Sequence, residues 1–197
     1  MATTNLISKT LGEIRLQSGN GEPDHTTVAG SVYSDIDTGS VYISKGGGNW
    51  EPLVGVTHGE AFYTGNTTAT NITTVNVWFQ VGNNFTLGTS VGFSVDGNKF
   101  VLGEGRAGKY HIDANFTIQN VAGLASYDCG ISVNGANPAN GTFNTGTIDA
   151  TFIYDNVSVS FDVELQDEDE LTLAVRNIIN TNNIIVRHGQ INAYRVE

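Results

Sequence analysis

Cysteine and basic residues are scarce in this chain. Cys129 is the only cysteine among 197 residues, so an intrachain disulfide is impossible and a cysteine-based metal site has no support. Nine Lys and Arg residues stand against 20 Asp and Glu residues, which gives a net charge of −11. That charge opposes attraction to the phosphates of nucleic acid and to anionic lipid, so we expect neither a nucleic-acid partner nor a membrane partner.

Apolar runs of transmembrane length are also missing from the sequence. Residues 1–10, MATTNLISKT, lack the basic region and the apolar stretch of a secretory signal peptide. We therefore expect a soluble protein that is synthesised in a cytoplasm. The length suits one good core, or one core with a small accessory module, rather than two large domains.

Strand signals dominate what is present. Only 15% of residues are charged, while 24 are glycine and 39% are hydrophobic, which is typical of a globular protein with short strands and tight turns. No segment has helical periodicity. Alternation of apolar and polar residues predicts strands in segments 75–81, 91–95, 110–118, 127–133, 157–165, 171–175 and 184–196. About eight to ten such strands suit an all-β fold, a two-sheet sandwich with jelly-roll connections.

The chain is predicted to have three parts. Residues 1–28 are polar and interrupted by glycine and proline, which indicates an extended arm. Residues 29–59 form a small β-meander anchored by Trp50, with a turn at Asp37–Gly39 and a short linker at its end. This module is too small to be stable alone, so we expect it to pack on a neighbour or another subunit. Residues 60–197 form the jelly roll.

One glycine-rich stretch, GEGRAGKYHIDANF at residues 103–116, fits two nucleotide-binding patterns. Both patterns need a helix after the glycine loop, with its N-terminal amides facing the phosphate. Here every second residue from Lys109 to Ile118 is apolar, which is the period of a strand, and Tyr110 occupies the position of the magnesium-binding hydroxyl. We therefore expect a turn between two strands, with Tyr110 pointing into the core and no nucleotide bound.

Two acidic segments are candidate calcium sites. Asp35–Gly39 resembles the start of a calcium loop but lacks the later ligands, so a turn stabilised by Asx bonding is favoured. Residues 167–170, DEDE, lie between two predicted strands, where a solvated hairpin is favoured over a calcium site completed by another subunit.

Catalytic and metal-binding patterns are weak. The four histidines lack metal-ligand spacing, and His111 and His188 are expected on strand faces, exposed or at a subunit seam. Cys129 has the strand parity of its apolar neighbours, which favours a buried side chain over a reactive thiol. No serine lies in a nucleophile elbow and no carboxylate pair can be placed across a cleft, so we expect no enzyme activity, no cofactor and no metal.

Trp78 is the remaining aromatic candidate. It has the polar-side parity of its predicted strand, so it is expected either at a subunit interface or exposed as a carbohydrate platform.

The C-terminal part resembles the C1q/TNF-type trimeric jelly roll. The resemblance rests on GKYHIDANF at 108–116, on VELQ at 163–166 before DELTLAV at 169–175, and on INAYRV at 191–196. It covers roughly residues 60–197, and the collagen or coiled-coil stalk of many animal members is missing. It implies a homotrimer with Tyr110, Phe116 and Tyr194 at the trimer interface.

The N-terminal part is similar to a module of tailed-phage appendages, found in tail fibres and capsid-surface proteins. The matching residues are GEP at 21–23, AGSVYSD at 29–35, TGSVYI at 38–43 and NW at 49–50. The resemblance implies attachment to a virion, for which Tyr33, Tyr42 and Trp50 are the candidate residues.

Together these resemblances imply a phage virion protein. Our first hypothesis is a homotrimeric decoration, or cement, protein that binds the major capsid protein on the outer surface of a phage head, after synthesis in the host cytoplasm. The alternative is a tail-fibre or receptor-binding tip that recognises a host surface glycan. A third possibility, an enzyme such as a glycan hydrolase, is disfavoured because no carboxylate pair is identifiable.

Overall fold

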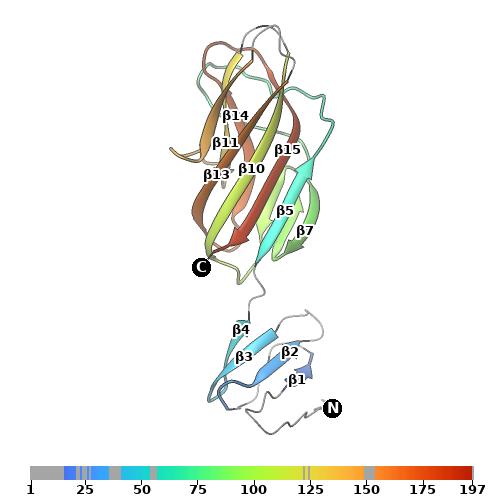
Figure 1. Cartoon of the computed structure of the whole chain (residues 1–197), viewed down its shortest axis with the longest axis vertical. Helices are drawn as coiled ribbons and strands as arrows, with labels where there is room; N and C mark the ends of the chain where they lie inside the picture. The colour runs from blue at the N-terminus through green and yellow to red at the C-terminus, as the bar shows by residue number, and fades with distance from the viewer. Residues whose placement is uncertain are drawn as a thin grey trace. The chain divides into compact units, whose positions relative to one another are not determined.

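The computed structural model describes residues 16–20, 23, 26, 28–35, 41–53, 57–121, 123, 125–148 and 154–196. The chain divides into two compact units, residues 1–56 and residues 57–197, and each is described by itself (Figure 1). Most of the predicted arm, the predicted turn at Asp37–Gly39 and the start of the predicted linker lie outside the described residues.

The first unit contains a four-stranded sheet in the order β1-β2-β3-β4. Its strands are β1 (Leu16–Gly19), β2 (Val32–Asp35), β3 (Val41–Gly46) and β4 (Asn49–Leu53). Strands β2 to β4 pair antiparallel, and β1 adds to β2 in parallel. Residues 16–19 were expected in the arm, because a parallel partner more than ten residues away leaves no local signal in a polar sequence.

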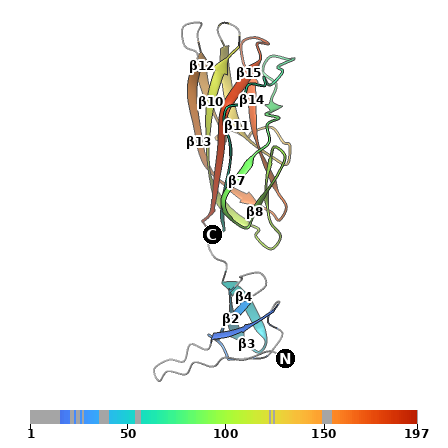
Figure 2. The ribbon, with the colours of Figure 1, turned by 90° about the vertical axis from the view of Figure 1, so that its right-hand side faces the viewer.

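The second unit is a sandwich of two antiparallel sheets (Figure 2). One sheet has the order β13-β10-β15-β5-β7, and the other has the order β12-β11-β14-β9-β8, with β6 paired to β14. The strands are β5 (His58–Tyr63), β6 (Phe79–Gln80), β7 (Thr86–Val91), β8 (Phe93–Asp96), β9 (Lys99–Leu102), β10 (Gly108–Asn120), β11 (Ala125–Val133), β12 (Phe143–Ile148), β13 (Tyr154–Leu165), β14 (Glu170–Asn177) and β15 (Ile184–Arg195).

The strand pairing is nested. Strand β5 pairs with β15, β9 with β14, β10 with β13, and β11 with β12. The first long pair thus joins the two ends of the unit, and each later pair lies inside the one before it in the sequence. This is the connectivity of a jelly roll, so the prediction of an all-β jelly-roll sandwich is confirmed.

The core lies between the two sheets and follows the alternation of the strands. On β10 the side chains of Tyr110, Ile112, Ala114, Phe116 and Ile118 all point inward and are buried. They meet the inward side chains of the opposite sheet, which include Phe100, Tyr127, Ile131, Leu171 and Leu173. Cys129 is also fully buried, as predicted, and burial raises the pKa of its thiol well above the ordinary value.

The strand predicted at residues 75–81 is largely wrong. Only Phe79–Gln80 pairs with β14, and the side chains of Val75 and Val77 are 39% and 43% exposed. Asn76 has a left-handed φ of 61°, and its amide donates to the carbonyl of Asn177. An apolar alternation can occur in a loop that crosses a sheet, because the pattern alone does not provide a strand partner.

Helices are not found in the part of the chain that the structure describes, so none there has the length and apolar composition to cross a membrane.

A substitution at Gly189 tests how closely the two sheets pack. A Cβ at this position would collide with Leu173 and would lie 2.7 Å from Cζ of Tyr63. We expect Gly189→Ala to lower the free energy of unfolding by about 1–3 kcal/mol, the usual cost of overpacking. Gly82→Ala is the control, because a Cβ there meets no atom within 4 Å. Equal midpoints for the two variants in urea denaturation would contradict this account of the core.

Candidate functional site

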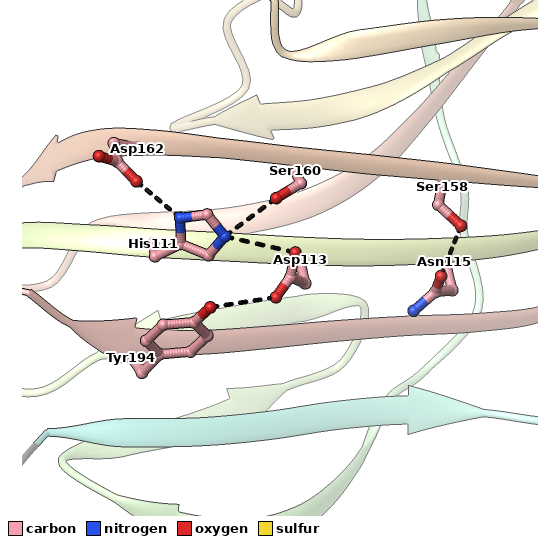
Figure 3. Close-up of polar contacts among 7 residues, drawn as sticks. All are labelled: His111, Asp113, Asn115, Ser158, Ser160, Asp162 and Tyr194. Atoms are coloured by element: carbon pink, nitrogen blue, oxygen red, sulfur yellow. Dashed lines mark hydrogen bonds and ion pairs between the residues drawn. The ribbon is translucent and has the colours of Figure 1, made fainter.

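The outer face of the five-stranded sheet carries a cluster centred on His111. Outward positions of β10 place His111 and Asp113 on this face, and the strand register sets His111 opposite Asp162 of β13 and Tyr194 of β15. Ser160 of β13 completes the group (Figure 3). We call these five residues the His111 cluster.

The cluster is connected through both nitrogens of the imidazole. His111 Nδ1 lies 2.6 Å from Asp162 Oδ1, and Nε2 lies 2.9 Å from Ser160 Oγ and 3.4 Å from Asp113 Oδ1 (Figure 3). The ring of Tyr194 lies 5.0 Å from the imidazole, and its hydroxyl donates to Asp113 Oδ2 at 3.4 Å. Three strands are therefore linked on one surface.

The carboxylates favour the charged form of His111. The hydrogen bond to Asp162 is the main cause of a raised His111 pKa, and Asp113 adds to it. The same hydrogen bond lowers the pKa of Asp162, with a further contribution from Lys109, whose Nζ lies 3.6 Å from Asp162 Oδ2. The two shifts agree in describing an imidazolium–carboxylate pair.

The order Ser160–His111–Asp162 matches the connectivity of a catalytic triad, but its electrostatics differ. A general base must be neutral to accept the serine proton. The second carboxylate, Asp113, lies 3.4 Å from Nε2, the nitrogen that would have to accept the serine proton, and Asp162 and Asp113 both raise the His111 pKa. The arrangement therefore differs from a triad at Nε2, where a carboxylate competes with the serine, and it is suited to holding charge pairs on the sheet.

A hollow of about 310 Å³ lies on the same face, at the Asn115 side of the cluster. A bulge between Thr117 and Ile118 shifts the register of β10 against β15 next to this hollow. Its outward side chains carry amides, hydroxyls and an imidazole, from Thr64, Asn115, Thr117, Asn156, Ser158, His188 and Gln190. None of them is acidic, although the chain has 20 Asp and Glu residues.

The three predicted attachment residues come together in the first unit. The ring of Tyr33 lies edge-on to Tyr42 at 6.3 Å and to Trp50 at 5.9 Å. Tyr33 is only 6% exposed and forms the core of this small sheet, while Tyr42 and Trp50 are half-buried. Only the latter two present surface to a partner, and their role in attachment stays a prediction.

The predicted trimer-interface residues do not share a surface. Tyr110 and Phe116 are fully enclosed between the sheets, and the Tyr110 hydroxyl donates to the Arg106 carbonyl. Their assignment to an interface is wrong, because the chain's own core already covers both side chains. Tyr194 is different: it is 40% exposed on the outer face, and its interface role stays a prediction.

The glycine-rich loop and the acidic run contact each other. Residues 103–107 form the turn between β9 and β10, as predicted. Asp167 Oδ1 accepts hydrogen bonds from the amides of Arg106 and Ala107 at 2.8 and 2.7 Å, and such backbone bonds lower its pKa. The acidic run joins strands of different sheets, so it is not a hairpin. Within the described residues no group of acidic, histidine or cysteine side chains could hold a metal ion.

Trp78 is partly exposed, and its ring packs edge-on against Phe143 at 5.5 Å. The sequence analysis missed Asp113, Ser160 and Asp162. Their outward parity on two strands was visible, but the register that sets them beside His111 was not.

No family model and no curated protein matches the sequence. Among solved structures, the PRD1 vertex protein P5 is 14% identical, with 73% of this chain and 99% of that chain covered and a TM-score of 0.47. Murine APRIL is 11% identical, with 71% and 99% covered and a TM-score of 0.42.

The pH dependence of the His111–Asp162 pair has a defined sign. The His111 pKa lies above its ordinary 6.5, so this stabilisation is complete below pH 6.5 and is lost as the pH rises through the raised pKa. The Asp162 pKa lies below 3.8, so its contribution is present above pH 3.8 and is lost as the pH falls through the lowered pKa.

Asp162→Asn should therefore move the His111 pKa, measured by NMR titration, down toward 6.5. Asp96→Asn, on the other sheet, is the matched control and should leave it unchanged. A His111 pKa that stays the same in Asp162→Asn would show that the pair does not form in solution.

Proposed function

We propose that this chain is a structural protein of a bacteriophage particle, a homotrimer that decorates the outer surface of the head and fastens neighbouring capsomers. The observation that carries the proposal is the pairing of a jelly-roll unit, which has one broad polar sheet face, with a separate small sheet built around aromatic residues. We propose that the first unit binds the major capsid protein and that the second unit forms the trimer. No enzymatic step is part of this function.

Self-association is supported by the charge distribution of the second unit. Copies of a chain with a net charge of −11 repel one another, so they meet at lowest cost where carboxylates are absent or paired. The outer face of the five-stranded sheet offers both conditions, in the hollow, whose lining includes no carboxylate, and in the His111 cluster. Tyr194 adds exposed aromatic surface there. Three copies related by a three-fold rotation close into a ring, so every copy of the contact surface is used within the trimer.

Attachment through the first unit is supported by its size and its sequence. A four-stranded sheet with so small a core gains stability from a partner surface. Its residues resemble the attachment module of tailed-phage appendages, and Tyr42 and Trp50 are half-buried aromatic side chains of the kind that anchor protein interfaces. Fastening is then mechanical, since each trimer adds contacts between capsid subunits.

A tail-fibre tip that recognises a host glycan is the second candidate. The partly exposed Trp78, on the outer face of the other sheet, favours it. Location on the particle separates the two functions, because a decoration protein covers the head and a fibre tip is confined to the tail.

Tyr194→Asp tests the trimer. The side chain is exposed in the single chain, so the fold should persist, whereas a charge placed without a partner in an interface costs several kcal/mol. We expect the trimer dissociation constant to rise at least roughly a hundredfold, measured by analytical ultracentrifugation. Ile179→Asp, also at an exposed apolar residue, is the control. Trimers of Tyr194→Asp that persist at low concentration would remove this face from the interface.

The location on the particle is tested by cryo-EM and quantitative gel analysis of purified virions. Decoration predicts many copies spread over the head, and Trp50→Ala should lower their occupancy while the second unit stays trimeric. A few copies confined to the tail would refute decoration and establish the fibre tip.

A further inference from the structure

The outer face of the six-stranded sheet carries an arginine that packs against two aromatic rings. The guanidinium carbon of Arg176, on β14, lies 4.7 Å from the ring centre of Trp78 and 5.2 Å from that of Phe143. The two rings meet edge to face at 5.5 Å. Trp78 comes from the segment before β6 and Phe143 from β12, so three separate parts of the chain converge on one guanidinium.

A buried carboxylate fixes the orientation of this arginine. The side chain of Asp128, on β11, is only 4% exposed. Asp128 Oδ2 accepts from Arg176 Nε at 2.7 Å, and Oδ1 accepts from the Thr145 hydroxyl at 2.6 Å. A buried carboxylate is costly unless it is paired, so Arg176 is tied to this position.

The contact with Asp128 uses one donor of the Arg176 guanidinium, its Nε. Among the described residues, neither of its terminal nitrogens makes a hydrogen bond. The side chain is 22% exposed, so part of it reaches solvent. Both rings are also partly exposed. The surface therefore combines N–H donors with two partly exposed aromatic rings.

A purely structural role would be to tie the segment before β6 onto the sheet. That role is already served by hydrogen bonds from Asn76 N to Asn177 O and from Val81 N to Leu173 O, and by the pairing of β6 with β14. Tethering also requires only one ring and no unused donors. The second ring and the two terminal nitrogens of Arg176 are the features that it leaves unexplained.

We propose that Trp78, Phe143 and Arg176 form a binding site for a neutral saccharide. The C–H face of a sugar ring packs against the aromatic side chains, and adjacent hydroxyl oxygens accept from the terminal nitrogens of Arg176. A neutral ligand fits because Asp128 balances the charge of Arg176, while the net charge of −11 opposes an anion. Decoration needs no small ligand, so this site goes beyond the first proposed function and assigns residues to the glycan recognition of the second.

The chain provides its own reporter for a test. It contains two tryptophans, and Trp50 lies in the first unit, so Trp50→Phe leaves Trp78 as the single tryptophan of the full-length protein. Emission is titrated with glucose, galactose, N-acetylglucosamine and rhamnose, and with glucuronate as the anionic probe. We expect a saturable change with at least one neutral sugar and weaker binding of glucuronate.

The variant Arg176→Lys separates binding from folding. Lysine retains a cation for Asp128 but loses the forked donors, so affinity for the sugar should fall about tenfold or more while circular dichroism stays unchanged. Arg187→Lys, on the other sheet, is the matched control and should bind as the parent does.

Three results would overturn the proposal: no saturable response to any sugar at tens of millimolar, tighter binding of glucuronate than of every neutral sugar, or equal affinity in Arg176→Lys. Trimer formation by the same proteins, and head binding by the parent chain with Trp50 in place, report on decoration separately. A failed sugar titration with intact trimers therefore refutes this site alone.

Discussion

The alternation of strand β10 is the constraint on which the second unit depends. This strand pairs with both β13 and β15, and its inward side chains, from Tyr110 to Ile118, fill the space between the sheets. Its outward side chains include His111 and Asp113. A slip of one residue in register would exchange these two sets, placing charge in the core and aromatic rings in solvent. The core and the His111 cluster are therefore two consequences of the same pairing.

The few basic residues of the chain form specific ion pairs on the surface of the second unit. The chain has nine Lys and Arg residues, and the ion pairs on the described part of the sandwich include Lys99 with Glu170, Lys109 with Asp162, and Arg176 with Asp128. The first two pairs are largely exposed and contribute little to stability. The third differs because Asp128 is buried, so the position of Arg176 is specified far more strictly. Geometry of that kind is what a binding surface needs.

Tyr110 and Trp78 show which structural features the alternation of apolar residues predicts and which it does not. Tyr110 was expected to point inward from parity alone, and it does, which also removes it from an interface that the family resemblance had suggested. The alternation of its neighbours predicted Trp78 in a strand. In the structure Trp78 lies in the loop before β6, where its ring contacts the Arg176 side chain and its backbone pairs with no strand. Side chains that meet across strands, such as His111 and Asp162, leave no mark on either segment by itself.

Local periodicity and the backbone angles near glycine were enough to predict the all-β class, the inward and outward sides of the long strands, the burial of Cys129 and the turn at residues 103–107. Which strands are neighbours depends instead on contacts between distant parts of the chain. Register joins residues 51 positions apart in the His111–Asp162 pair and 48 positions apart in the Asp128–Arg176 pair. Such contacts arise from the packing of two whole sheets, whose shared core selects one pairing among many that the local patterns allow.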